Sequence, residues 1–199
     1  MRQTKTQVRA AILAARAATT PQQRTAEAAA LTRHLLALIT PDTTVCAYVP
    51  VGSEPGSADL LDELTARGVR VLLPVAQTDG DGVPQPLEWG VHRSGALIHA
   101  AFGLREPPPP HLPPRAVAEA RTVLVPALAA DRAGVRLGRG AGFYDRTLQL
   151  ASPGAQLMAV VRDDELVDAL PHEPHDVRMT HAVTPGGGIV TLGATPGRE

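Results

Sequence analysis

A chain of 199 residues with 44% hydrophobic content is long enough to form its own hydrophobic core, and we expect a single domain over residues 1–199. The formal net charge is −1, and acidic and basic residues are interspersed along the chain. Nucleic acid and anionic membranes bind to a basic face or tail, so this charge pattern argues against both as partners. The sole cysteine, Cys46, cannot form an internal disulfide, and it lies in an apolar run, which predicts a buried, unreactive thiol.

The N-terminal segment is basic and amphipathic, as transit peptides are. It contains no long apolar region, however, and no stretch of the chain reaches the length of a membrane span. We therefore interpret residues 5–18 as a helix of the mature protein, which we expect to be a cytoplasmic monomer. A second helix is predicted over residues 21–39, because Thr20 is a good N-cap and Pro21 suits the first helical position.

The next segment predicts a strand, a helix and a second strand. Residues 44–49 are a short apolar run with β-branched residues, and residues 58–67 have helical spacing and end at Gly68. Residues 69–73 form the second strand, which we expect Pro74 to stop. A unit of this kind favours parallel pairing of its strands.

The middle of the chain, residues 76–114, is rich in Gly, Pro and Asp. It contains short strand candidates at residues 86–89 and 97–102. The run of four prolines at residues 107–110 predicts a rigid, extended connector.

The C-terminal half predicts further alternation of strands and helices. A strand at residues 122–125 leads through a glycine-rich loop into a helix that ends near residue 150, and two more strands follow at residues 156–161 and 181–183. We expect the glycine-rich end, about residues 186–199, to be a loosely ordered tail. The alternation predicts an α/β fold of three layers, in which helices cover both faces of a central mixed, largely parallel sheet.

The glycine-rich loop is the strongest sign of chemistry in the sequence. Guanidinium groups, closely spaced glycines and a following helix start are combined within ten residues, and each of them favours binding of an anion such as phosphate. The spacing of Gly138, Gly140 and Gly142 matches neither the Walker loop nor the Rossmann fingerprint. Asp145, one turn into the helix, is suited to bind a metal ion that is held by phosphates.

The run PALAADRAGVRLGRGAGFYDRTL resembles the signature of the 5-formyltetrahydrofolate cyclo-ligase family, usually PGLxFDxxGxRLGxGxGYYDxxL. Three other landmarks of the family stand at suitable distances along the chain. They are an N-terminal basic pair (Lys5 and Arg9), a segment after the first strand (Tyr48, Pro50 and Glu54) and a mid-chain motif (Phe102, Gly103, Leu104, Glu106 and Pro107). The resemblance covers residues 5 to about 184.

This resemblance implies an enzyme that uses ATP and Mg²⁺ to convert 5-formyltetrahydrofolate into 5,10-methenyltetrahydrofolate, ADP and phosphate. In such a reaction the γ-phosphoryl group moves to the formyl oxygen, N10 of the same folate attacks, and phosphate leaves. The protein then supplies positioning and electrostatic stabilisation rather than a nucleophile.

The resemblance also implies a role for individual residues. It implies an ATP site formed by Lys5, Arg9, Arg136, Leu137, Gly138, Arg139, Gly140, Ala141, Gly142, Phe143 and Tyr144. It implies a folate site formed by Val49, Glu54, Arg139, Gly140, Gly142 and Phe143. Asp145 matches the Mg²⁺ ligand, and Arg139, Tyr144 and Asp145 are the residues expected at the reacting groups. Trp89 could line the folate pocket, although a lone tryptophan in a strand is more often part of the core.

Some positions depart from the family pattern. Ala130 stands where the family often has Phe, which would make one pocket wall smaller, and Thr180 stands where some members place a second metal-binding Asp. His172, His175 and Asp176 suggest a zinc site only superficially, because the neighbouring prolines break the helix that such a site needs. We expect an ordinary polar loop there, with Asp176 as a hydrogen-bond acceptor.

Two alternatives remain open at this point. The chain could be a folate- or nucleotide-binding regulator without turnover, for which the departures at Ala130 and Thr180 are the motive. It could also be a related ATP-dependent enzyme that acts on another formyl or amide compound.

Overall fold

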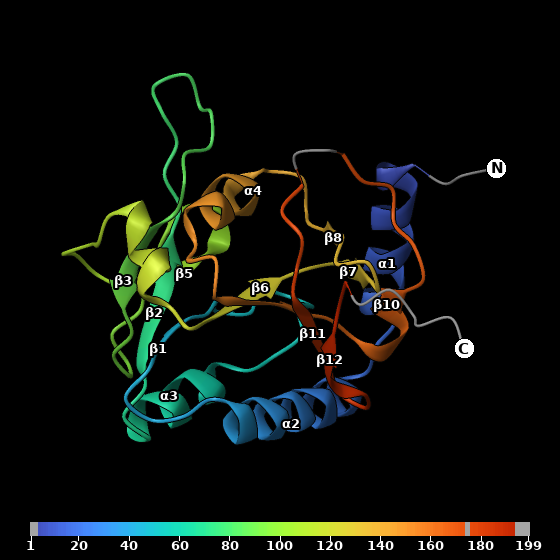
Figure 1. Ribbon diagram of the computed structural model, residues 1–199, viewed down its shortest axis with the longest axis horizontal. Coiled ribbons are helices and arrows are strands. Elements are labelled where there is room, and N and C mark those ends of the chain that lie inside the picture. The colour runs from blue at the N-terminus through green and yellow to red at the C-terminus, as the bar shows by residue number, and fades with distance from the viewer. Residues whose placement is uncertain (1–3, 174–175, 194–199) are drawn as a thin grey trace.

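The computed structural model describes residues 4–173 and 176–193, except for the side chain of Phe102. Its centre is a seven-stranded sheet in the order β12-β11-β9-β6-β1-β2-β3 (Figure 1). The strands are β1 (Thr44–Cys46), β2 (Arg70–Val75), β3 (Glu88–Val91), β6 (Thr122–Pro126), β9 (Gln156–Val160), β11 (His181–Thr184) and β12 (Gly188–Thr191). All pairs are parallel except β2–β3 and β11–β12 at the two edges. The predicted mixed, largely parallel sheet is confirmed.

Helices cover both faces of this sheet and complete the three-layer α/β/α fold. On one face lie α2 (Pro21–Leu38) and α3 (Ala58–Ala66), and on the other lie the short helix α4 (Phe143–Thr147) and the 3₁₀ turn Pro114–Glu119 (Figure 1). Side chains of a strand alternate between the faces, so Val45 of β1 packs with Leu31 and Leu35 of α2, whereas Cys46 belongs to the apolar cluster of the opposite face. Cys46 is fully buried, as predicted, and burial raises the pKa of its thiol.

Both N-terminal helices begin at the expected residues. Thr20 caps α2 together with Gln23, with Pro21 as the first helical residue, and Thr4 caps α1 (Lys5–Ala17) together with Gln7 in the same way. In each pair the threonine hydroxyl accepts a backbone N–H of the first turn, and the glutamine side chain accepts the N–H of the threonine. The cap at Thr20 was predicted from the sequence, whereas the cap at Thr4 and both glutamine contacts were not.

A small second sheet, which the sequence analysis did not predict, supports α1. It consists of β7 (Ala129–Asp131), β8 (Arg136–Leu137) and β10 (Leu166–Val167). Val8 and Ile12 of α1 pack against an apolar cluster that includes Ala129 and Leu137 of this sheet. The helix therefore lies beside β7, β8 and β10 rather than on the main sheet (Figure 1).

The middle of the chain is less regular than the rest. Its strand candidates appear as β3 and as a two-stranded hairpin of β4 (Ile98–His99) and β5 (Arg105–Glu106), with a 3₁₀ turn at Ala101–Gly103 between them. Two further 3₁₀ turns follow, at Leu148–Leu150 and Asp163–Glu165. The helix expected to continue to about residue 150 is thus α4 followed by a 3₁₀ turn.

Two local expectations are wrong. Pro74 does not stop β2, which continues to Val75. The register with β1 ends at Leu72, so Pro74 pairs only with β3 and its missing N–H breaks no parallel ladder. The glycine-rich end is not a loose tail over its whole length either, because β12 forms a hairpin with β11. Residues 194–199 of the expected tail lie outside the described part of the chain.

Asp163 explains why this glycine-rich segment is ordered. Its carboxylate accepts hydrogen bonds from the N–H groups of Gly186 and Gly187 and from the hydroxyl of Thr184. Burial alone would raise the pKa of Asp163, but these hydrogen bonds prevail and lower it below its ordinary value. The glycines thus form a turn around the carboxylate of Asp163. Among the described residues, no helix is long and apolar enough to cross a membrane.

Candidate active site

A cavity of about 470 Å³ opens at the carboxyl ends of β1, β2 and β6. This is the edge at which ligands bind in open α/β sheets. Every residue that the resemblance implies for the ATP, folate and Mg²⁺ sites lines this one cavity. Lys5 and Arg9 reach it from α1, Val49 and Glu54 from the segment after β1, and Arg136, Leu137, Gly138, Arg139, Gly140, Ala141, Gly142, Phe143, Tyr144 and Asp145 from β8, the glycine-rich loop and α4. The fold therefore brings together side chains from three distant parts of the sequence.

The glycine-rich loop takes a conformation that needs its glycines. Gly140 and Gly142 have φ values of +102° and +83°, in the left-handed region that other residues rarely adopt. Gly142 is also the N-cap residue of α4 and has no side chain to cap it. Since α4 is only five residues long, the loop's N–H groups and the surrounding guanidinium groups, rather than a helix dipole, are the main source of attraction for an anion.

Arg136 is fixed within the site by two neighbours. Its Nη2 atom lies 2.5 Å from Oδ1 of Asp145, and its side chain is 6% exposed. The same guanidinium lies over the ring of Tyr144, 5.8 Å from the ring centroid. These contacts hold one positive charge in a defined place in the wall of the cavity.

The hydroxyl of Tyr144 is buried and has no hydrogen-bond partner among the described residues. Burial raises the pKa of this phenol well above its ordinary value, and the Glu54 carboxylate raises it further. Tyr144 thus stays protonated at neutral pH. Because an unpaired buried O–H is costly, this group is suited to donate a hydrogen bond to a ligand in the cavity.

Asp145 shares its carboxylate between Arg136 and solvent, since the side chain is 40% exposed. The described residues contain no group of three or more His, Cys, Asp or Glu side chains that could hold a metal ion. Asp145 can therefore bind Mg²⁺ only as a single protein ligand, with phosphate oxygens and water molecules as the other ligands. This coordination is common for Mg²⁺.

Glu54 connects the glycine-rich loop to the segment after β1. Its Oε1 atom lies 3.1 Å from Nε of Arg139, and its Oε2 accepts the N–H of Val51 at 2.9 Å. The loop that carries Glu54 is closed by Tyr48, whose hydroxyl donates to the carbonyl of Pro55 at 2.5 Å. The carboxylate is therefore oriented within a closed loop before any ligand binds.

The basic pair on α1 lies on the side of the cavity next to the glycine-rich loop. Arg9 donates through Nε to the carbonyl of Gly138 at 2.9 Å. The ammonium of Lys5 lies 3.2 Å from Asp176 and 3.4 Å from Glu173. Asp176 also lines the cavity, in agreement with its expected role as an acceptor, whereas His175 lies outside the described residues.

Three positions considered in the sequence analysis lie away from the cavity. Thr180 is hydrogen-bonded to the backbone of Leu157 near the start of β9, at the end of the sheet opposite the cavity, so it does not occupy a metal site. Ala130 is fully buried in β7 and does not line the cavity. Trp89 is 1% exposed, belongs to the core and donates to the carbonyl of Pro114, so the core interpretation is confirmed.

Part of the cavity wall was not predicted from the sequence. Leu104, Arg105 and Glu106 line the cavity, and Glu106 accepts the N–H of Ala76, which follows β2, at 2.9 Å. These residues belong to or adjoin the mid-chain motif that is part of the family resemblance, so that motif could have indicated them. The motif alone does not show, however, that its residues line the cavity.

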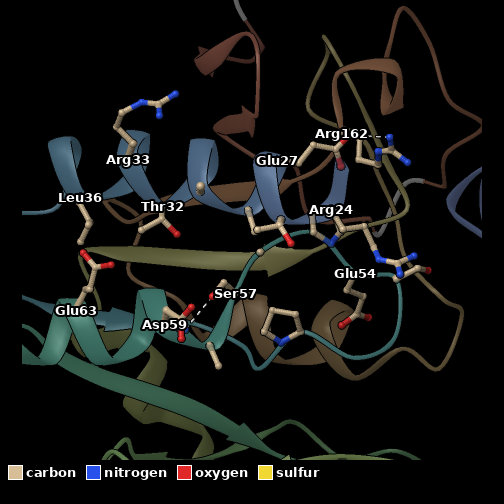
Figure 2. Close-up of a pocket in the computed structure, with 18 of the residues that line it drawn as sticks. Arg24, Glu27, Thr32, Arg33, Leu36, Glu54, Ser57, Asp59, Glu63 and Arg162 are labelled. Carbon is tan, nitrogen blue, oxygen red and sulfur yellow. Dashed lines mark hydrogen bonds and ion pairs between the residues drawn. The ribbon is translucent and has the colours of Figure 1, made fainter. Parts of the chain in front are cut away.

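A second, wider groove of about 890 Å³ lies between α2 and the start of α3. Figure 2 shows Arg24 and Glu27 of α2 on one side of it, and Ser57, Asp59 and Glu63 on the other. The segment that carries Glu54 separates this groove from the first cavity, and both Arg16 and Glu54 line the two. Acidic and basic side chains are mixed in the groove, with no concentration of one sign.

Comparisons with known proteins agree with this geometry. Residues 1–185 match the 5-formyltetrahydrofolate cyclo-ligase family. The chain is 60% identical over 188 residues to the 5-formyltetrahydrofolate cyclo-ligase of Mycolicibacterium smegmatis, a match that covers 94% of this chain and 97% of that protein. It is 31% identical over 143 residues to the protein of the same name from Escherichia coli K12, covering 71% and 78% of the two chains.

Solved structures show the same fold. The 5,10-methenyltetrahydrofolate synthetase of Aquifex aeolicus superposes with a TM-score of 0.78 at 23% identity, over 98% of this chain and 96% of the other. The synthetase of Mycoplasma pneumoniae gives a TM-score of 0.69 at 19% identity, over 89% and 96%. With nearly its whole length covered by the family match and by a highly similar relative, the chain belongs to the 5-formyltetrahydrofolate cyclo-ligase family.

Proposed function

We propose that the protein catalyses the ATP- and Mg²⁺-dependent cyclisation of 5-formyltetrahydrofolate to 5,10-methenyltetrahydrofolate, with release of ADP and phosphate. The observation that carries this proposal is that a cationic, glycine-rich loop and an oriented carboxylate, Glu54, face one cavity. The names of the relatives from M. smegmatis and E. coli support the same activity.

The phosphates of ATP would lie against the glycine-rich loop. Arg9 and Arg139 would provide charge on two sides of them, while Arg136 holds its place through Asp145. Guanidinium groups suit this task because they donate in a fixed fork to phosphate oxygens. Lys5 would add a compact charge from the N-terminal end of α1.

Asp145 would hold Mg²⁺ through the carboxylate oxygen that Arg136 leaves free. When bound, the ion neutralises charge on the phosphates and aligns the transferred group. The neighbouring Arg136 limits Asp145 to a single ligand position, so the affinity for the ion should depend strongly on ATP.

The folate would bind with its pterin toward Glu54. A carboxylate can accept hydrogen bonds from pterin N–H groups, and Glu54 has its orientation fixed by Val51. The protonated hydroxyl of Tyr144, a residue of the same wall, is buried and has no hydrogen-bond partner within residues 4–173 and 176–193. We assign to it the role of donating a hydrogen bond to a ligand oxygen.

The chemistry itself needs alignment rather than a protein nucleophile. Transfer of the γ-phosphoryl group to the formyl oxygen turns that oxygen into a leaving group, N10 attacks the formyl carbon, and phosphate departs. The protein's part would be to hold the two substrates in line and to stabilise the transferring charge, and we assign the second task to Arg139 and Arg136. The one thiol, Cys46, lies buried in the core and takes no part.

The test is an assay of purified protein with 5-formyltetrahydrofolate and MgATP, followed by the near-ultraviolet absorbance of the methenyl product. Asp145→Asn and Arg139→Gln should each lower kcat/KM by about a hundredfold, as loss of a transition-state charge contact does. Arg132→Gln, at an exposed position paired with Asp168, is the matched control and should keep full activity. Absence of product from folded, ATP-binding wild type would refute the proposal.

No observation favours a regulator without turnover. That alternative was considered because Ala130 and Thr180 depart from the family pattern, and neither residue lines the cavity. A panel of other formyl and amide compounds in the same assay tests the remaining alternative. We also propose that the protein works as a cytoplasmic monomer with neither nucleic acid nor membrane as a partner, in keeping with its formal net charge of −1.

A further inference from the structure

A buried ion pair between Arg16 and Glu165 has no place in the chemistry described above. The two side chains are 1% and 4% exposed. They meet through two hydrogen bonds, from Nε to Oε1 at 2.6 Å and from Nη2 to Oε2 at 2.8 Å. A buried pair of this kind adds little net stability, because removing both charges from water costs about as much as their attraction returns. We therefore looked for a role of this ion pair other than stabilising the fold.

The pair joins the end of α1 to the floor of the active-site cavity. Nη2 of Arg16 also donates to the carbonyl of Ala127, which directly follows β6 and lines the cavity. Glu165 accepts in addition the N–H of Arg162, which fixes the carboxylate at the 3₁₀ turn beyond β9. Arg16 is thus held by acceptors from two strand ends at once.

The same helix carries the basic pair of the cavity at its other end. Lys5 precedes Arg16 by 11 residues, which corresponds to about 16 Å along a helix. A helix is stiff over this length, so a tilt of about 5° at Arg16 would displace Lys5 by more than 1 Å. Val8 and Ile12 attach the middle of the helix by apolar contacts, and Arg9 adds one hydrogen bond there, to the carbonyl of Gly138. Arg16 makes three hydrogen bonds in a buried setting, so it fixes the direction of the helix more strictly.

We propose that Arg16 and Glu165 are positioning residues, which set the direction of α1 so that Lys5 and Arg9 reach the phosphates of ATP. This inference rests on the proposed function, because it assumes that the protein binds ATP. Its distinctive consequence is that the pair acts on the nucleotide and not on the folate, because α1 carries Lys5 and Arg9 of the ATP site but no residue of the proposed folate site.

The chain offers a direct reporter of the position of α1. Lys5 is the sole lysine in the sequence. Reductive methylation with carbon-13 formaldehyde therefore labels only Lys5 and the terminal amine, and it keeps the positive charge. The NMR signal of the methylated Lys5 reports its contact with Glu173 and Asp176, and its shift on addition of MgATP reports contact with the nucleotide.

The experiment compares Arg16→Gln, Arg16→Met and the double variant Arg16→Met/Glu165→Leu with wild type, none of which adds a lysine. The double variant leaves no unpaired charge and is the one most able to fold. Arg70→Met is the matched control, because Arg70 pairs with Glu119 at the exposed start of β2, away from the cavity. Folding is checked by thermal unfolding, and binding of ATP and of folate is measured separately by calorimetry.

We expect the folded variants at Arg16 to bind ATP about ten- to a hundredfold more weakly, because Lys5 and Arg9 lose charge-assisted hydrogen bonds to the phosphates. Affinity for folate and kcat at saturating ATP should change less than threefold, and the Lys5 signal should move and lose its response to MgATP. An unchanged ATP affinity and Lys5 signal in a folded variant would overturn the inference. Equal losses for ATP and folate, or failure of every variant to fold, would overturn it too.

These readouts are independent of turnover. If wild type binds ATP but forms no methenyl product, the proposed function fails while the ATP affinities and the Lys5 signal still decide the role of Arg16. If product forms and the Arg16 variants keep their ATP affinity, only the positioning role fails.

Discussion

Replacement of Gly142 by alanine tests how the glycine-rich loop works. Gly142 has a φ of +83°, and an alanine in this left-handed region costs about 1–2 kcal/mol. A Cβ would also lie 2.5 Å from Nη1 of Arg146. That atom is the end of an exposed, flexible side chain, which can move away, so we expect the conformational cost to dominate.

The matched control is Gly68→Ala. Gly68 has a φ of +84°, almost the same as Gly142, and a Cβ there meets no atom within 4 Å. Both variants should therefore lose about 1–2 kcal/mol of unfolding free energy if the backbone keeps its native conformation. If the loop at Gly142 instead relaxes to avoid the strain, the cost appears as weaker ATP binding, by about 5- to 30-fold.

The assay pairs urea denaturation with KM for ATP in the cyclisation reaction. For Gly142→Ala we expect KM for ATP to rise and KM for folate to change much less, while Gly68→Ala should change stability alone. Adding Arg146→Ala to Gly142→Ala should restore little, since the side chain is not the main obstacle. Equal KM values for wild type and Gly142→Ala, with no loss of stability, would refute the reasoning.

Three further predictions concern stability. The pKa of Asp163 is lowered in the folded protein, so its contribution is fully present above about pH 4, the ordinary range of an aspartate, and is lost as the pH falls through the folded-state pKa. Asp163→Asn should remove this acid-side decline in urea denaturation curves, and an unaltered decline would contradict the assignment. Thr147→Val should cost about 1–3 kcal/mol, because the Thr147 hydroxyl accepts the N–H of Leu87 at 2.8 Å in a buried setting. Thr147→Ser should recover most of that loss, and equal costs for both variants would argue against the hydrogen bond. Leu35→Ala should cost about 2–5 kcal/mol, since Leu35 is 1% exposed between α2 and the sheet. The exposed Leu13→Ala is its control, and similar midpoints for the two in thermal unfolding would show that the core is placed wrongly.

Features whose cause is local were predicted correctly from the sequence. The starts of α2 and α3 and the parallel pairing of β1 with β2 follow from capping residues, glycine and short connections. The glycine-rich loop could be identified for the same reason, since its glycines and arginines are adjacent in the chain.

Features that depend on distant contacts could not be predicted. The small sheet of β7, β8 and β10 consists of strands of two or three residues, too short for any periodicity, and it is stabilised by α1 packing against it. The turn that leads into β12 is held by hydrogen bonds to Asp163, which lies more than twenty residues earlier in the chain. The resemblance aligned Thr180 with a metal-binding Asp of some family members, but its neighbours in the fold are the backbone groups of β9.

The position of α1 also matters for how the protein is produced. A purification tag fused ahead of residue 1 would lie within four residues of Lys5, which lines the active-site cavity. The other end of the described chain leaves from a different place, because the N–H of Leu192 donates to the carbonyl of Thr180 at the opposite end of the sheet. A tag after the last residue should therefore leave KM for ATP unaffected, whereas an uncleaved tag at the front should compete with the nucleotide for space.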